Sequence, residues 1–218
     1  MFRFSVVTDS LPFLLGGLKI TLIVTLASLL LAFVIGLVVG MMRLSKLRLL
    51  SIPASAFVLV LRNTPLLVQL IWVYYCLPII FGLDLSPVAS CVIALALHGG
   101  AYTAEIVRAG IQSIDPGQME AAKSIGLTYI QAMRKIILPQ TFRRITPPLA
   151  NEGITLLKYS SLVSTLGVAD LTYNAQVIAT TTFRPLEIYS ALAIEYFVLC
   201  SILQYATYRL ELHLAKSG

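Results

Sequence analysis

The sequence predicts an all-α, polytopic membrane protein with five transmembrane helices and one long cytoplasmic loop. Of its 218 residues, 58% are hydrophobic and only 12% are charged, whereas soluble domains carry about 25% charged residues. Between Lys19 and Arg43 the chain carries no charged side chain, and this run is long enough to cross a hydrocarbon core of roughly 30 Å. It is too long for the apolar region of a signal peptide, so we expect it to be retained as a span.

Apolar runs of similar length predict four further spans and leave no room for a second domain. Arg62 and Pro65 predict an irregular cytoplasmic end for the second span, with the Arg62 side chain extended toward water. Glu152 and Lys158 interrupt the fourth span. The predicted transmembrane domain covers residues 1–218, with spans at about 18–42, 57–81, 86–107, 145–169 and 188–210.

Lysine and arginine are distributed unevenly among the connections between these spans. The first connection carries three of them and the third carries six, whereas the second carries none and the fourth carries only Arg184. Because basic residues in short loops stay in the cytoplasm, we expect an external amino terminus and a cytoplasmic carboxyl terminus. This topology also accounts for the net charge of +6, so no nucleic-acid partner is predicted.

Residues suited to metal or covalent chemistry are scarce. Cys76, Cys91 and Cys200 lie in apolar runs without C-x-x-C spacing, so we expect packing side chains rather than a zinc site or a disulfide. The two histidines, His98 and His213, are far apart in sequence. We therefore predict no metal site and no catalytic residue, which disfavours a membrane-embedded enzyme.

The third connection begins with the signals of a short helix. Asp115 is a good N-cap, and Gln118 is placed to complete a capping box. Met119, Ala122 and Ile125 follow at i, i+3 and i+6, so they share one helical face. Spacing alone leaves two interpretations open. The segment rests on the lipid surface, or one apolar face rests on protein while this first helix projects outward.

A second short helix follows in the same segment, residues about 115–140. Gly126 fits a left-handed C-cap that ends the first helix. Thr128 and Gln131 form a second capping box, and Pro139 is expected to end the helix that they begin. The prediction is a helix, a glycine turn and a second helix.

Polar side chains inside the spans are candidates to line a pathway, since intramembrane charges usually face a bundle interior or an aqueous cavity. For Glu152, Lys158 and Glu195, pairing with a neighbouring span remains an alternative. Gly36 and Gly40 have a spacing that permits close helix approach, which we expect within the subunit. The candidates are Asn151, Glu152, Lys158, Ser160, Ser161 and Ser164 in the fourth span, Gln69 and Tyr74 in the second, and Glu195 in the fifth.

Residues 120–139, EAAKSIGLTYIQAMRKIILP, resemble the EAA loop of permease subunits of binding-protein-dependent ABC importers. The family pattern, Glu-Ala-Ala-x3-Gly-x9-Ile-x-Leu-Pro, is filled throughout. Residues 62–70, 100–114 and 147–172 resemble the polar amino acid uptake subfamily, whose members include histidine, glutamine, glutamate and arginine permeases. Tyr159 departs from this subfamily, because its relatives often have an acidic residue after the lysine.

The resemblance implies a type I ABC importer permease fold and a non-catalytic subunit that imports a polar amino acid across the bacterial inner membrane. The implied partners are a dimeric ATP-binding subunit, a second permease chain (identical or paralogous), an external solute-binding protein and membrane lipid. The chain has no G-x-x-x-x-G-K-[ST] phosphate loop, so we expect ATP and Mg to be used by the partner ATPase and no cofactor to be bound here. An autonomous channel or carrier is the rival interpretation, but it has no use for a docking loop.

In this family the first EAA helix is a coupling helix, which docks in a cleft of the ATPase. The residues implied in coupling are Glu120, Ala121, Ala122, Ile125, Gly126, Leu127, Leu138 and Pro139.

Overall fold

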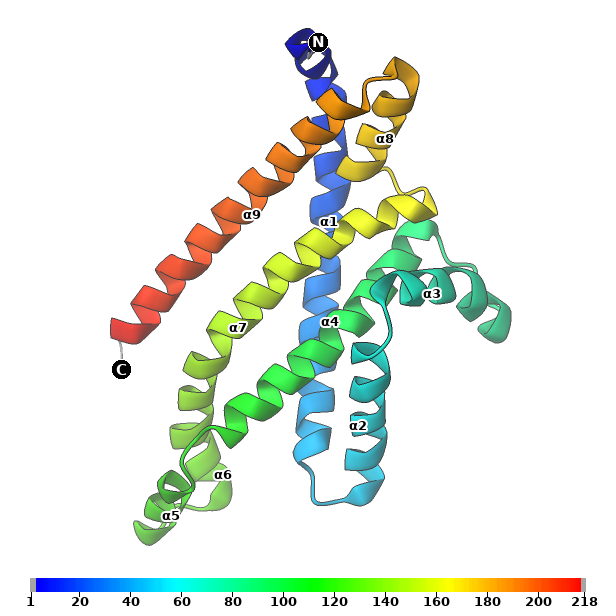
Figure 1. The fold of residues 1–218 in the computed structure, drawn as a ribbon. Helices are drawn as coiled ribbons and strands as arrows, with labels where there is room; N and C mark the ends of the chain where they lie inside the picture. The colour runs from blue at the N-terminus through cyan, green and yellow to red at the C-terminus, as the bar shows by residue number, and fades with distance from the viewer. Residues whose placement is uncertain (1–2, 217–218) are drawn as a thin grey trace.

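The computed structural model describes residues 3–216, and the side chains of residues 3–212. Helix is the only regular secondary structure within residues 3–216, as Figure 1 shows. The elements are α1 (Phe4–Leu44), α2 (Arg48–Arg62), α3 (Leu66–Phe81), α4 (Pro87–Gln112), α5 (Pro116–Ser124), α6 (Tyr129–Ala132), the π-helical turn η1 (Met133–Ile137), α7 (Leu138–Tyr159), the 3-10 helix η2 (Ser160–Leu166), α8 (Leu171–Thr182) and α9 (Pro185–Lys216).

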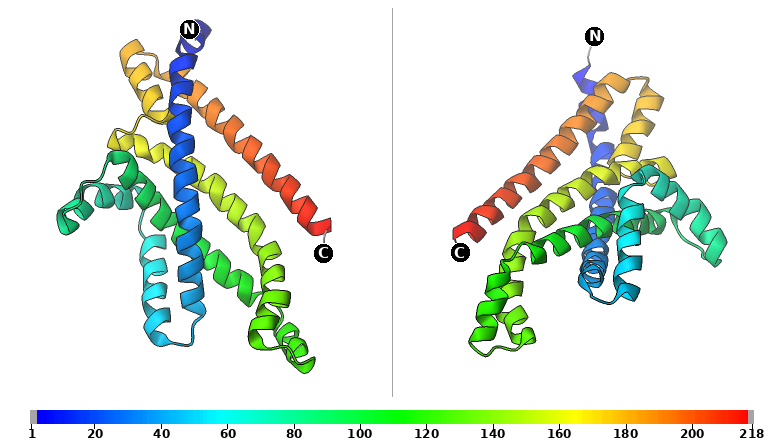
Figure 2. Two further views of the ribbon diagram at one scale, coloured as in Figure 1. Left: turned by 180° about the vertical axis from the view of Figure 1, so that it is seen from behind. Right: turned by 60° about the horizontal axis from the view of Figure 1, so that its bottom comes forward.

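The long helix α1 is the axis on which the other helices pack. Its 41 residues span about 60 Å, so the predicted first span lies inside a longer helix. Its most extensive contact is with α4, which crosses it obliquely in both views of Figure 2. A Cβ atom on Gly36 would lie 2.3 Å from the Thr103 side chain, and one on Gly40 would lie 3.0 Å from the Ala104 carbonyl oxygen. The close approach predicted from these glycines is therefore confirmed, within the subunit.

The predicted second span is not one continuous helix. The described chain contains three helices that are long and apolar enough to cross a membrane, α1, α4 and α9, and α2 with α3 forms a further pair bent by 109°. Thr64 precedes a proline, which disfavours helical backbone there, and Pro65 has no N–H to continue the ladder. The irregular end expected at this position is thus a full break, and α3 leaves the bundle sideways (Figure 1).

Side chains satisfy the backbone groups that the break sets free. Asn63 and Thr64 donate to carbonyl oxygens one turn back, at 2.8 and 2.7 Å. The Gln69 amide nitrogen donates both to the Leu61 carbonyl oxygen, at 2.7 Å, and to the Thr64 carbonyl oxygen, at 2.9 Å. Because an unpaired carbonyl in hydrocarbon is costly, these bonds make the bend a stable feature.

The fourth predicted span corresponds to α7, which is less apolar than the prediction required. Unlike α1, α4 and α9, it is not among the described helices that are long and apolar enough to cross a membrane. Its polar and charged residues are tolerated because α7 packs against α4 on one side and α9 on the other. The described residues therefore contain three candidate spans, or four if the bent pair α2–α3 is one span, and the predicted count of five is not confirmed.

Pro139 was expected to end a helix, but the helix continues through it. The π-helical turn η1, Met133–Ile137, joins α6 directly to α7, and Pro139 stands in the first turn of α7. Proline is tolerated in the first turn of a helix, and the π turn before it shifts the hydrogen-bond register. The segment between α4 and α7 therefore runs into α7 without a helix end between them.

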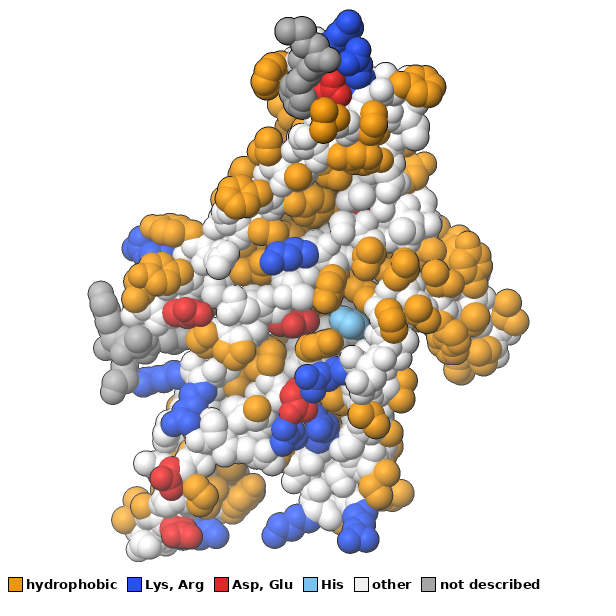
Figure 3. Space-filling view, viewed as in Figure 1, with side chains coloured by type: hydrophobic (Ala, Val, Ile, Leu, Met, Phe, Trp, Pro, Cys, Tyr) orange, Lys and Arg blue, Asp and Glu red, His pale blue; other side chains and the backbone are white. Residues whose placement is uncertain are grey.

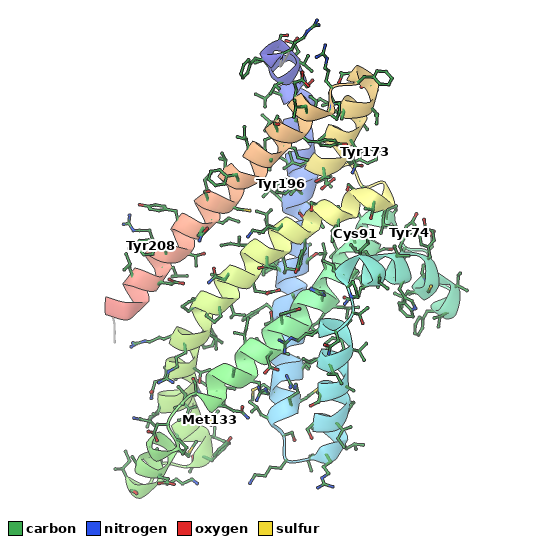
Figure 4. All side chains as sticks on the ribbon, in the orientation of Figure 1. Tyr74, Cys91, Met133, Tyr173, Tyr196 and Tyr208 are labelled. Carbon is green, nitrogen blue, oxygen red and sulfur yellow. The ribbon has the colours of Figure 1, made fainter. Side chains whose placement is uncertain are left out.

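The helix α8 was not predicted, since residues 170–184 read as a connection. Asp170 caps it by accepting from the Tyr173 amide at 2.8 Å. Its first turn lies on α1, where the Thr21 hydroxyl oxygen accepts from the Leu171 amide at 3.1 Å. On the other side the Tyr196 hydroxyl of α9, labelled in Figure 4, lies 3.2 Å from the Thr172 hydroxyl. These bonds join α1, α8 and α9 at one end of the molecule.

The α1–α4 contact provides a stability test. We expect Gly36→Ala to lower the melting temperature of the purified protein, because a new Cβ would overlap Thr103 and overpacking typically costs about 1–3 kcal/mol. Gly16→Ala on the same helix is the matched control, since the nearest atom to its new Cβ is Asn174 Nδ2 at 3.8 Å. Equal melting temperatures for the two variants would contradict this account of the contact.

Candidate functional site

The segment between α4 and α7 is shaped by two N-caps. The Asp115 carboxylate accepts from the Gly117 amide at 2.7 Å, at the start of α5. Within the described residues Gln118 does not complete the box, so the first cap is simpler than predicted. The second is a full capping box as predicted: Thr128 accepts from the Gln131 amide at 3.3 Å, and the Gln131 side chain accepts from the Thr128 amide at 2.9 Å.

Gly126 makes the turn between the two helices. Its φ is +81°, as a left-handed C-cap requires. Its amide donates to the Lys123 carbonyl at 2.9 Å, and the Leu127 amide donates to the Ala122 carbonyl at 3.1 Å, which together form a Schellman motif. No atom lies within 4 Å of a Cβ built on Gly126, so a substitution there is strained by its backbone rather than by crowding.

The three residues of the apolar face predicted on the first helix differ in their exposure to solvent. Ala122 is buried within the segment, Met119 is half-buried, and Ile125 is 75% exposed. Tyr129 and Ile130, just beyond the turn, are also exposed. The exposed apolar surface is therefore the tip around Gly126, which Figure 1 places at the far end of the molecule from the amino terminus.

The other residues implied in coupling lie on both sides of this tip. Glu120, Ala121, Gly126, Leu138 and Pro139 are exposed, and Leu127 is half-buried.

The base of this segment is packed tightly. The Arg144 guanidinium donates to the Ser113 carbonyl across the two ends of the segment. A Cβ on Gly110 of α4 would lie 2.1 Å from the Ile145 side chain of α7. The tip is therefore attached to α4 and α7, and the close packing of these two helices opposes sliding of one past the other.

A cavity of about 600 Å³ lies at the break between α2 and α3; we call it the break cavity. His98 of α4 is buried beside it, with Nδ1 3.2 Å from the Gln69 side-chain oxygen. Its ring packs against Tyr102, with centroids 5.0 Å apart, and against Tyr159 at the end of α7, at 5.5 Å. The lining is Arg62, Asn63, Thr64, Pro65, Leu66, Leu67, His98, Tyr102, Tyr159 and Leu162.

Most of these lining residues were missed as site residues from the sequence. Gln69 was predicted and contacts His98, but His98 was considered only as a metal ligand and Arg62 only as a snorkelling charge. Two signals could have found them. An arginine and a histidine lie inside apolar runs, and intramembrane ionisable residues mark functional sites by default.

The pathway residues predicted in the fourth span do not converge on this cavity. Asn151 and Lys158 are exposed, and Glu152 is half-buried, with one carboxylate oxygen that has no hydrogen-bond partner among the described residues. The hydroxyls of Ser160, Ser161 and Ser164 donate to backbone carbonyls three residues back, at 2.7, 2.7 and 2.8 Å.

The remaining candidates lie on α3 and α9. Tyr74 of α3 stacks edge-on against Tyr75, with ring centroids 4.7 Å apart, on the part of the molecule that extends sideways in Figure 4. Glu195 of α9 has two buried carboxylate oxygens without a hydrogen-bond partner among the described residues. Their role in a pathway stays a prediction.

Four charged side chains from three helices meet beneath the break cavity. Glu105 of α4 pairs with Arg108 on its own helix and also with Arg43 of α1. Arg62 of α2 lies 3.7 Å from the same carboxylate and places its guanidinium 5.1 Å from the centre of the Tyr102 ring. Figure 3 shows basic side chains gathered around an acidic one in this lower half of the face.

The chain matches a family model and several characterised proteins over nearly its full length. Residues 32–216 match the model described as binding-protein-dependent transport system inner membrane component. The probable amino-acid ABC transporter permease protein YckA of Bacillus subtilis is 39% identical over 93% of this chain and 89% of its own length. The glutamine transport system permease protein GlnP of Escherichia coli (strain K12) is 37% identical over 96% of both chains.

Solved structures show the same fold. A crystal structure of an amino acid ABC transporter with histidines superposes with a TM-score of 0.92 at 38% identity, covering 98% of this chain and 99% of that one. The MetNI methionine ABC transporter in an inward-facing conformation gives a TM-score of 0.78 at 23% identity, covering 94% of this chain and 97% of that one. The second likeness concerns the fold alone.

Proposed function

The chain belongs to the family of inner membrane components of binding-protein-dependent transport systems, and we propose that the break cavity holds the transported solute while the α5–α6 tip couples the chain to an ATPase. The chain is a permease subunit of an amino acid ABC importer. The relatives are named for arginine, glutamine and cystine transport, which supports a polar amino acid as the substrate.

The break cavity supplies groups that fit the two charges of an amino acid. Arg62 can bind the α-carboxylate through its guanidinium, and the face of Tyr159 can receive the α-ammonium by cation–π attraction. The juxtaposition of Arg62, His98 and Tyr159 around one cavity at the break carries this proposal. The Gln69 side chain donates to two backbone carbonyls at the break, so the cavity is formed before the solute binds.

The lining of the break cavity also bears on the side chain that it accepts. Its described lining contains no acidic residue, and Tyr159 stands where the resembled subfamily often has one. A cationic side chain would find no counter-charge there. We therefore propose a substrate with a neutral or acidic side chain, such as glutamine or glutamate, rather than arginine.

The remaining parts of the transport unit come from other chains. An ATPase dimer would bind ATP and Mg, an external solute-binding protein would deliver the amino acid, and a second permease chain would complete the pathway. The family description names the binding-protein dependence, which supports the external partner. In this arrangement the present chain is non-catalytic, in the bacterial inner membrane, with its amino terminus outside and the α5–α6 tip in the cytoplasm.

The substrate proposal is tested by restoring an acidic residue. We expect Tyr159→Asp to raise the affinity of the purified permease–ATPase complex for L-arginine relative to L-glutamine by several-fold, because a carboxylate would face a cationic side chain. Equilibrium binding of the two labelled amino acids is measured without the solute-binding protein, so that its own selectivity does not enter. Tyr159→Asn is the uncharged control. An unchanged preference in Tyr159→Asp would remove Tyr159 from the substrate site.

The coupling proposal is tested at the turn. Gly126→Val forces a β-branched residue into φ +81°, a strain of roughly 1 kcal/mol or more, which should re-aim the tip. We expect less ATPase retained on affinity purification of the permease and weaker stimulation of ATP hydrolysis by loaded solute-binding protein. Glu120→Lys should act similarly, since it places positive charge near the amino-terminal end of α5.

Gly126→Asn is the matched control for the turn, because asparagine tolerates the left-handed conformation. Its ATPase retention and stimulation should stay close to wild type. If Gly126→Val also keeps both, the tip does not couple, and the interpretation of a segment resting on lipid takes its place.

The proposed orientation predicts opposite labelling of two sites in a cysteine-free background. Asp84→Cys, in the connection after α3, should react with an impermeant thiol reagent in cells whose outer membrane has been permeabilised. Ser113→Cys, at the end of α4, should react only after the inner membrane is opened. Both side chains are exposed. Labelling of both before opening would contradict the orientation.

A further inference from the structure

A second cavity, of about 630 Å³, lies next to the break cavity, on the side where Glu105 meets the three arginines. We call it the basic cavity. It is bounded by the ends of α1 and α2 and by α4, with Arg43, Ser55 and Glu105 in its wall. Arg62, Asn63 and Tyr102 line both cavities. The two spaces are therefore separated by three side chains rather than by a helix.

The basic cavity carries uncompensated positive charge. Its wall contains two arginines, Arg43 and Arg62, and one carboxylate, Glu105. Glu105 is already engaged by Arg43 and by Arg108, which lies outside the wall. Arg43 is largely buried, and its Nε has no hydrogen-bond partner among the described residues. A buried donor without a partner is costly, and several such charges together attract an anion into a partly desolvated space.

Arg62 is the least constrained of these arginines. Its side chain is 40% exposed and lies 3.7 Å from Glu105, beyond hydrogen-bond distance. It is the last residue of α2, directly before the break, and it rests on the face of Tyr102. A guanidinium held by a ring face can turn toward either cavity without losing that contact.

We propose that the basic cavity is a second binding station, which receives the α-carboxylate of the amino acid after it leaves the break cavity, with Arg62 passing it from one to the other. This inference rests on the proposed function of the break cavity. A guanidinium binds a carboxylate through two parallel hydrogen bonds. As Arg62 turns toward Glu105, its carboxylate ligand comes within reach of Arg43, and the surplus positive charge holds it there.

The same positive charge would also suit the phosphate of an anionic lipid. Continuity with the break cavity through Arg62, Asn63 and Tyr102 favours the amino acid. The polar Ser55 and Asn63 in the wall suit a small zwitterion better than an acyl chain. The experiment separates the two sources by lipid composition.

The test uses charged thiol reagents on single cysteines, with the three native cysteines replaced by alanine. Ser55→Cys reports on the basic cavity and Thr64→Cys on the break cavity, each in the permease–ATPase complex reconstituted in phosphatidylcholine vesicles. We expect an anionic sulfonate reagent to modify Ser55→Cys several-fold faster than a cationic ammonium reagent. Ser51→Cys, one turn earlier on α2 and outside the cavity wall, should show no such preference.

The amino acid is then tested as a protecting ligand. Millimolar L-glutamine or L-glutamate should slow modification of Ser55→Cys several-fold, whereas L-glutamine α-amide, which lacks the free carboxylate, should not. Arg43→Gln and Arg62→Gln should each remove both the protection and the preference for the anionic reagent. Arg43→Lys should retain part of them, which a loss of packing alone would not produce.

The outcomes separate this inference from the proposed function. Protection at Thr64→Cys without protection at Ser55→Cys would overturn the second station and leave the break cavity as the substrate site. Protection at neither position would overturn both. Protection at Ser55→Cys that appears only when phosphatidylglycerol is added, with or without amino acid, would assign the basic cavity to lipid and overturn the inference.

Discussion

The requirement that backbone groups inside a membrane find partners governs the region around the proposed substrate site. A proline break frees several carbonyl oxygens, which would be unsatisfied in hydrocarbon. The Gln69 side chain binds two of them, and the Thr64 hydroxyl binds a third. These bonds stabilise the bend of 109°. The break in turn opens the break cavity and leaves Arg62 at a free helix end, so the polar route follows from how the break is stabilised.

Two other helices connect this region to the α5–α6 tip. Helix α4 contributes His98 and Tyr102 to the break cavity, and its far end packs against Ile145 of α7 through Gly110. The same helix crosses α1 through small residues that admit no displacement without overlap. If the α5–α6 tip couples to an ATPase as proposed, its movement would reach the break cavity through α4 and α7. Packed interfaces of this kind shift between discrete arrangements rather than deforming gradually.

The sequence predicted most reliably those features that local chemistry decides. The second capping box and the left-handed Gly126 depend on neighbours in sequence. The sharp bend depends on how Gln69 reaches back across the break, and no periodicity reveals it. The helix α8 was missed because its stability comes from Thr21 of α1, which is 150 residues away from its partner Leu171.

Charge explains why the candidate site was predicted only in part. Hydrophobic periodicity locates spans, but it does not show which side chain pairs with a charge inside them. It therefore gave no reason to prefer Arg62 over Glu152 or Lys158 as a residue of the site. In the structure Lys158 is exposed, whereas Arg62 shares Glu105 with two other arginines and rests on Tyr102. Arg62, the charged residue that lies between the two cavities, thus belongs to a cluster whose members come from several helices. An arginine with one weak ion pair and one aromatic contact can exchange partners at small cost, as a moving anion requires.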